Sequence, residues 1–348
     1  MGHVSVIVLG YGTEDHLEEA LQALASQTRP EDEFLLVDNG IADIATRRES
    51  WPRQVRVLGG GANTGFTGGC LMAAAEATGE VLIFVNSDAI VRPGALDALR
   101  AAAEEPDVGI VGGCLRLADR PDVVNSVGNP LQFAGITWAG ACGEPAARHM
   151  ARTEVPVATG GLFALRREVW DELGGFDDLY FAYHEDTDLS LRCWLSGRRV
   201  ITEPTAIADH YYEFGRNPRK MYLLERNRLI TVLTDYPPRT LRTLLPTILL
   251  LEPAFLVLAV LQGWSRQKLA AWTWLVRHRS ALRARRRRVQ AAVRTPDPDR
   301  VLATLLSARI EPPMVAHPPG MGLINWALES SWTRSRRRLL RSSSTATP

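Results

Sequence analysis

The chain has 348 residues, 46% of them hydrophobic, which suffices for one large α/β domain with a substantial core plus an appendage. Its four cysteines form no CxxC pair, which argues against a zinc cluster or a disulfide scaffold and favours a reducing, cytoplasmic setting. Net charge is only +1, yet residues 264–348 hold 17 Arg and Lys against 4 Asp and Glu. This asymmetry points to a negatively charged partner, either nucleic acid or an anionic membrane surface.

The first hundred residues alternate between strand and helix patterns. Strands are predicted at 4–9, 33–37, 53–58 and 81–85, and helices at 14–26, 68–78 and 93–103. The first strand has no basic leader before it, so no signal peptide is expected. The alternation predicts a parallel sheet with right-handed crossovers, in which ligands bind beyond the carboxyl ends of the strands. Asp38 with Asn39, and Asn86 with Asp88, end two of these strands.

The middle of the chain is less regular. Residues 117–154 are rich in Gly, Pro and polar residues, and they predict loops and irregular strands. An apolar strand is expected at 157–165, an amphipathic helix at 186–196 with Gly197 as its cap, and a further strand at 199–202.

Leu244–Leu261 is an apolar run of about the length, roughly 20 residues, that crosses a bilayer. Pro246, Glu252 and Pro253 interrupt it, and a carboxylate in hydrocarbon costs about 3 kcal/mol. A single span would also place Arg285–Arg288 across the membrane from the N-terminal domain, against the positive-inside tendency. We therefore expect a helix in the membrane interface or a shallow hairpin. A buried helix packed on the protein body is the alternative.

Two domains are expected, at residues 1–235 and 236–348, the second helical and basic. The arginine run in the second lacks the interleaved aromatic residues of a nucleic-acid stacking platform. An anionic membrane surface is therefore the favoured partner over nucleic acid, and we expect a cytoplasmic protein that is peripheral on the cytoplasmic face of the cell membrane. The sequence does not indicate an oligomeric state.

Four segments occur in an order that resembles a known family. They are GANTGFTGG (61–69), VNSDA (85–89), HEDTDLSLR (184–192) and ADH (208–210). This set resembles the family 2 glycosyltransferases, closest to the bacterial rhamnosyltransferase-like branch. The opening VSVIVLGYG, the segment LLVDNG and RNR at 226–228 extend the resemblance over residues 4 to about 230.

The resemblance implies a GT-A fold, with a mostly parallel central sheet flanked by helices, here followed by a helical basic extension. It also implies an inverting, metal-dependent transfer of a sugar from a nucleoside-diphosphate sugar, with deoxythymidine diphosphate rhamnose as the first candidate. The acceptor would be a hydroxyl of a carbohydrate or of a polyprenyl-linked saccharide in cell-envelope glycan synthesis.

Such a transfer leaves negative charge on the departing diphosphate, which a Mn²⁺ or Mg²⁺ ion held by one or two carboxylates can neutralise. Asp88 stands where the family has the last Asp of its DxD metal motif, although the first acidic position is Asn86 here. By the same resemblance, His210 completes the metal shell. The alternatives are that Asp88 only caps a turn and that His210 is a satisfied polar residue.

Asp186 is the expected general base, because the start of a helix favours an ionised carboxylate. By resemblance it is the second acid of the family's ED pair, and Glu185 orients the acceptor. The alternative is that Asp186 and Asp188 are plain helix caps. A metal cluster that also includes His184 is disfavoured, because the helix points these side chains in different directions.

Asp38 is assigned by resemblance to the N3 hydrogen of a pyrimidine base. Asn63, Gly65 and Gly68 form a loop that can approach the nucleotide closely, because glycine lacks a side chain. The loop is not a P-loop, since the Lys and Ser/Thr of that motif are absent. The resemblance further places the nucleotide-sugar against Leu9, Tyr11, Asn86, Asp88, Gly160 and Gly161. Gly12 stands where the family commonly has Asn.

A second class of function stays open. A protein of this fold that lost catalysis could serve as a membrane-associated carbohydrate-binding or scaffold protein, and Asn86 is the residue that favours this reading. Retention of Asp88, Asp186 and His210 together argues against it.

Overall fold

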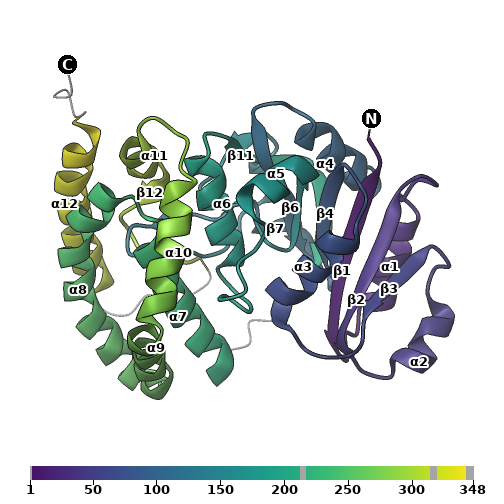
Figure 1. Cartoon of the computed structure of the whole chain (residues 1–348), viewed down its shortest axis with the longest axis horizontal. Helices are drawn as coiled ribbons and strands as arrows, with labels where there is room; N and C mark the ends of the chain where they lie inside the picture. Colours follow the sequence, from purple (N-terminus) through teal and green to yellow (C-terminus); the bar gives the residue numbers. More distant parts are fainter. Residues whose placement is uncertain (1, 212–216, 314–319, 342–348) are drawn as a thin grey trace. The chain divides into compact units, whose positions relative to one another are not determined.

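The computed structural model describes residues 2–211, 217–313 and 320–341. The chain divides into two compact units (Figure 1). The first comprises residues 1–129, 139–193 and 198–214, and the second comprises 130–138, 194–197 and 215–348. The helix at 218–235 belongs to the second unit, whereas the expected domain division placed it with the first.

A ten-stranded mixed sheet forms the centre of the first unit. Its main path runs β3-β2-β1-β4-β10-β6-β11-β5, with β7 beside β6 and β9 beside β11. The strands are β1 (Val4–Gly12), β2 (Glu33–Ile41), β3 (Val55–Gly59), β4 (Val81–Asn86), β5 (Ala89–Val91), β6 (Val108–Leu117), β7 (Arg120–Ser126), β9 (Thr153–Glu154), β10 (Leu162–Arg166) and β11 (Arg199–His210).

The parallel half of the sheet matches the sequence prediction, and the other half does not. Strands β3, β2, β1 and β4 are parallel, whereas β10 is antiparallel to both β4 and β6. Strand β6 was not predicted, and β7 lies in the stretch 117–154 that was expected to form loops and irregular strands. The strand expected at 157–165 is shorter, because it begins only after Gly161.

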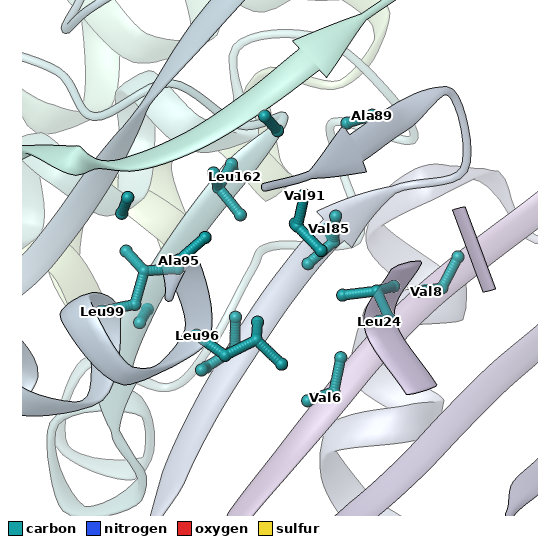
Figure 2. Close-up of a cluster of buried hydrophobic side chains, with 14 of the residues drawn as sticks. Val6, Val8, Leu24, Val85, Ala89, Val91, Ala95, Leu96, Leu99 and Leu162 are labelled. Carbon is teal, nitrogen blue, oxygen red and sulfur yellow. The ribbon is translucent and has the colours of Figure 1, made fainter. Parts of the chain in front are cut away.

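Helices cover both faces of this sheet. They are α1 (Leu17–Ala25), α2 (Ile44–Arg47), α3 (Gly65–Glu76), α4 (Ala95–Ala103), α5 (Arg167–Leu173) and α6 (Glu185–Leu195). Alternate residues of β1, Val6 and Val8, lie in a buried cluster with Leu24 of α1 and with Leu96 and Leu99 of α4 (Figure 2). Burial of each such side chain contributes about 1.5–3 kcal/mol.

An aromatic cluster packs on the opposite face of the sheet. The ring of Phe84 in β4 stacks on Phe163 of β10 at 4.7 Å and on Trp170 of α5 at 5.0 Å between centroids. Strands with both faces buried read as continuous apolar runs, which explains why β1 and β4 could be found from sequence.

The second unit is helical. It contains α7 (Pro218–Asp235), α8 (Pro238–Leu261), α9 (Ser265–Arg277), α10 (Arg279–Ala291), α11 (Pro298–Leu305) and α12 (Met321–Leu340), with a short pairing of β8 (Leu131–Gln132) and β12 (Leu306–Ser307). Helix α7 packs against α9 and α10, and α8 against α9 and α12.

The apolar run forms one continuous helix, α8, through both of its prolines, so of the two expected forms, a helix and a shallow hairpin, it is the helix that is present. Glu252 is buried in it and accepts hydrogen bonds from Arg228 (2.7 Å), Lys268 (3.0 Å) and Trp272 (2.9 Å). Its charge is therefore compensated inside the unit. Within the described part of the chain, α8 is the one helix long and apolar enough to cross a membrane, and 22% of its most apolar stretch is buried.

Candidate active site

The two predicted metal-binding residues lie next to each other at one edge of the sheet. Asp88 sits in the two-residue turn between β4 and β5, with its side chain 37% exposed. His210 is the last residue of β11 and pairs with Ala89 of β5 and Leu117 of β6. Its Nε2 atom lies 3.1 Å from Oδ1 of Asp88.

This spacing suits a divalent cation. Oxygen ligands of Mg²⁺ lie about 2.1 Å from the ion, so two neighbouring ligands at right angles are about 3 Å apart. Among residues 2–211, 217–313 and 320–341 no group of three or more His, Cys, Asp or Glu could hold a metal ion. Asp88 and His210 would thus supply two ligands, and the open side of Asp88 leaves room for phosphate oxygens and water.

Asn125 of β7 completes this arrangement, and it was not predicted. Its Oδ1 lies 2.8 Å from Nδ1 of His210, and both side chains are buried. The residue falls in the stretch 117–154, where no sequence signal marked it.

A short series of backbone contacts joins the Asp88 turn to the start of α6. The amide of Asn86 donates to the carbonyl of Gly161 at 3.0 Å, and the amide of Gly160 donates to the Asp186 carboxylate. A Cβ on Gly160 would lie 3.4 Å from Asp186 Oδ2, and one on Gly161 would lie 3.3 Å from Asn86 Nδ2. Glycine at both positions therefore lets the two segments approach.

Glu185 and Asp186 are buried carboxyl groups, and burial raises the pKa of both. Burial and the neighbouring Asp186 raise the pKa of Glu185 to about 8, and its Oε2 has no hydrogen-bond partner in the described chain. Burial also raises the pKa of Asp186, which lines a small cavity with Ile110 and Phe163. Its carboxylate accepts hydrogen bonds from the amide (2.6 Å) and hydroxyl (3.2 Å) of Thr187. Glu185 is thus set to hold a proton at neutral pH, whereas the hydrogen bonds that the Asp186 carboxylate accepts oppose the effect of burial on its pKa.

The loop before α6 has an unusual backbone. Phe181, Tyr183 and His184 all have positive φ, between 63° and 68°, a conformation that is costly for residues with side chains. The carbonyl of Phe181 accepts the amide of Thr67 at 3.1 Å. A Cβ on Gly65 would lie 2.4 Å from that carbonyl, so only glycine fits there. The glycine-rich loop and the loop before Asp186 are therefore packed together.

Asp38 and Tyr11 lie near each other at the carboxyl ends of β2 and β1. Oδ1 of Asp38 accepts the amides of Gly40 (3.1 Å) and Ile41 (2.9 Å), which fixes the carboxylate. The Tyr11 ring is 52% exposed and would lie 3.5 Å from a Cβ on Gly40. An exposed ring beside a fixed carboxylate suits a planar base.

The glycine-rich loop is organised by Asn39, which is buried at the end of β2. Its Oδ1 accepts the amide of Thr64 at 2.8 Å, and its Nδ2 donates to the carbonyl of Gly65 at 3.3 Å. Oδ1 of Asn63 accepts the amide of Gly65 at 2.9 Å. Asn63 therefore shapes the loop, and a nucleotide contact from it would be an additional role.

Two further predicted residues contribute through packing. A Cβ on Gly69 would lie 2.2 Å from the side chain of Leu9, so Leu9 fills the space beside α3. A Cβ on Gly68 would lie 2.9 Å from that of Thr64, which keeps the helix start compact.

Residues 5–174 match the model of glycosyl transferase family 2. The chain carries a family 2 glycosyltransferase domain, as its motifs predicted. It is 34% identical over 222 residues to the O-antigen biosynthesis protein RfbC of Myxococcus xanthus, covering 60% of this chain and 17% of that protein. It is 29% identical over 242 residues to an N-acetylglucosaminyl-diphospho-decaprenol L-rhamnosyltransferase of Mycobacterium tuberculosis, covering 61% of this chain and 78% of that protein.

Solved structures share the fold. A structure of GalNAc-T7 with UDP, GalNAc and Mn²⁺ matches with a TM-score of 0.58 at 16% identity, covering 68% of this chain and 49% of the other. The mannosyltransferase PcManGT from Pyrobaculum calidifontis, in complex with GDP-Man and Mn²⁺, matches with a TM-score of 0.51 at 19% identity, covering 97% and 85%. The first unit thus has the GT-A fold, as expected.

Proposed function

We propose that this domain transfers a sugar, with inversion, from a nucleoside-diphosphate sugar to a hydroxyl of a carbohydrate or polyprenyl-linked acceptor in cell-envelope glycan synthesis. The observation that carries the proposal is the series of contacts from Asn86 through Gly161 and Gly160 to Asp186. It holds a buried carboxylate beside the turn that carries Asp88.

Asp186 is the general base. A single displacement requires a base on the side opposite the leaving diphosphate, and a carboxylate that accepts three hydrogen bonds is fixed in position. It takes the proton of the acceptor hydroxyl as oxygen attacks the anomeric carbon. Glu185, which holds its own proton, is suited to donate a hydrogen bond that orients the acceptor.

Asp88 and His210, which lie 3.1 Å apart, would hold the divalent cation, Mn²⁺ or Mg²⁺. A bound cation would neutralise the charge that develops on the departing diphosphate. Because Asp88 is the one carboxylate that the described residues place beside His210, affinity for the metal without nucleotide should be weak. Mn²⁺ is the better candidate, since imidazole suits it more than Mg²⁺.

On the donor side, Asp38 accepts the N3 hydrogen of a pyrimidine while Tyr11 covers the base. Deoxythymidine diphosphate rhamnose is the first candidate, because the relative from M. tuberculosis is named as a rhamnosyltransferase. That relative's name also supports a polyprenyl-diphosphate-linked acceptor.

A lipid-linked acceptor places the enzyme at the cytoplasmic face of the membrane, and the second unit offers a suitable surface. Helices α8 and α12 run antiparallel, since Thr247 bonds to Ser331 at 3.0 Å and Arg239 donates to the carbonyls of Arg338 and Arg341. We call their exposed side chains the α8–α12 face.

The α8–α12 face has an apolar part and a basic part. Its apolar residues are Leu249, Leu250, Val257, Val260 and Leu261 of α8 with Leu323, Ile324 and Trp326 of α12. Its basic residues are Arg242, Arg334, Arg336, Arg337, Arg338 and Arg341. Apolar side chains next to arginines fit an anionic bilayer surface, and the arginines would repel a second copy of the same face.

The experiment that tests the transfer is a screen of nucleotide-sugars for Mn²⁺-dependent hydrolysis and for protection against thermal unfolding. Hydrolysis of one donor supports the enzyme. Thermal protection by a free glycan without hydrolysis of any donor would favour the alternative, an inactive carbohydrate-binding or scaffold protein.

A further inference from the structure

His210 is held between two strands of the sheet, β5 and β6. Its backbone pairs with β5 and β6, and the amide of Tyr211 donates to the carbonyl of Asp88 at 3.0 Å. Strand β7 pairs with β6 and brings Asn125 within 2.8 Å of the imidazole Nδ1. The imidazole therefore lies between one buried amide and one half-exposed carboxylate, with 6% of the residue exposed.

The two ring nitrogens of His210 consequently have different roles in metal binding and hydrogen bonding. Nε2 faces Asp88 at 3.1 Å, and a cation held by both residues needs the lone pair of Nε2. The proton must then reside on Nδ1, which requires an acceptor there. Oδ1 of Asn125 is that acceptor at 2.8 Å, and a second ring hydrogen bond of this kind is general among metal-binding histidines.

We propose that Asn125 is a positioning residue that fixes the Nδ1–H tautomer of His210 and so keeps Nε2 available for the divalent cation. The inference rests on the proposed metal-dependent function. It assigns a role in the metal site to β7, a strand that contributes no ligand.

The orientation of the Asn125 amide decides whether this residue strengthens or weakens binding of the cation. With Oδ1 toward His210, the amide Nδ2 has no hydrogen-bond partner in the described chain. The reverse orientation would donate Nδ2–H to Nδ1, leave the proton on Nε2 and block the metal. The two orientations therefore predict opposite behaviour for an acceptor-only side chain at this position.

The experiment measures Mn²⁺ binding to the full chain by electron paramagnetic resonance of free Mn²⁺, with dTDP or UDP as the nucleotide. Asn125→Leu should raise the dissociation constant about 10- to 100-fold. Asn125→Asp, which retains the acceptor, should stay within about 3-fold of the wild type. Ser126→Ala, a change on the same strand that removes the bond to Asn129, is the matched control and should leave Mn²⁺ affinity unchanged. Thermal unfolding shows whether each variant is folded.

Equal Mn²⁺ affinity in the wild type and in folded Asn125→Leu would overturn the proposal, as would weaker binding by Asn125→Asp than by Asn125→Leu. Nitrogen-15 NMR of the histidine rings reads the tautomer directly, with His210→Gln to assign the signal. If the wild type binds no Mn²⁺, the proposed metal dependence fails by itself. In that case a proton on Nδ1 still upholds the role of Asn125, and one on Nε2 rejects it.

Discussion

Glu14 and Ser87 tie the loop after β1 to the turn that carries Asp88. The Ser87 hydroxyl donates to Glu14 Oε2 at 2.6 Å, and the amide of Tyr11 donates to Oε1 at 2.9 Å. Burial raises the pKa of Glu14. One carboxylate thus joins the candidate base-binding residue to the candidate metal turn.

Replacing Glu14 should therefore weaken donor binding. Loss of two hydrogen bonds, each contributing about 0.5–1.5 kcal/mol, predicts that Glu14→Ala weakens nucleotide affinity about 5- to 150-fold. Glu14→Gln should lose less, because the amide can accept from one group and donate to the other. Asp15→Ala, next in the chain and exposed, is the control. Calorimetric titration with nucleotide and Mn²⁺ measures the nucleotide affinity of each variant. Similar affinities for Glu14→Ala and Asp15→Ala would contradict the role of Glu14 in donor binding.

Asp186→Asn should lower turnover about 100-fold or more and leave nucleotide binding nearly intact, because only the proton acceptor is lost. Glu185→Gln should lower turnover less, since an amide can still donate a hydrogen bond to the acceptor. Steady-state rates and nucleotide titrations on the same preparations separate the two effects. Wild-type-like turnover of Asp186→Asn would remove Asp186 as the base.

The raised pKa of Glu185 should make the free energy of unfolding depend on pH. Its pKa is raised from 4.5 to about 8, so between these values the folded chain holds a proton that the unfolded chain releases. The free energy of unfolding therefore falls as pH rises through this window, and the loss is complete above about pH 8. Glu185→Gln should flatten this dependence. Urea unfolding at pH 5.5 and 8.5 tests it, and parallel pH profiles for both proteins would show that Glu185 is not the cause.

Local sequence patterns revealed β1, β2 and β4 because these strands carry buried apolar runs. Strand β6 (Val108–Leu117) escaped, since its three glycines weaken a strand pattern. A Cβ on Gly113 would lie 2.4 Å from Leu162, so glycine there serves the packing of β6 against β10. Only the neighbouring strand reveals this.

The residues of the candidate site also fall into those that the sequence revealed and those that it did not. Asp88, Asp186 and His210 could be named because their motifs resemble a family, and the structure places Asp88 beside His210. Asn125 and Glu14 could not, because their partners lie far away in the sequence and no short motif records such a contact. Supporting residues of a site are therefore the part that sequence patterns miss.

The buried charges around Glu252 should matter for the second unit. Arg228 and Lys268 each contact both Glu252 and Glu225, and these contacts keep the pKa of Glu225 near about 2. Glu252→Leu leaves buried cations partly uncompensated and should lower the free energy of unfolding by about 3 kcal/mol. Glu252→Gln should cost less, because its oxygen still accepts hydrogen bonds. A denaturant midpoint unchanged in Glu252→Leu would show that Glu225 alone balances the charges.

The α8–α12 face predicts binding to anionic vesicles with two separable contributions. Each arginine near such a surface adds about 1 kcal/mol, so Arg337→Ser with Arg338→Ser should weaken binding about 30-fold at low salt. The electrostatic contribution is screened within about 8 Å at physiological salt, so this variant should differ little from the wild type at high salt. Leu250→Ser with Trp326→Ser removes apolar contact and should weaken binding at every salt concentration.

Vesicle flotation with phosphatidylglycerol and phosphatidylcholine measures both contributions, with neutral vesicles as the control. Wild-type protein that resists both salt and carbonate extraction would indicate that α8 inserts, which requires the contacts of Glu252 with Arg228 and Lys268 to break. Wild-type protein that stays free of anionic vesicles at low salt would reject the membrane role. If it then also sediments as a dimer that Leu250→Ser with Trp326→Ser dissociates, the α8–α12 face binds a second copy, and a soluble acceptor is favoured over a lipid-linked one.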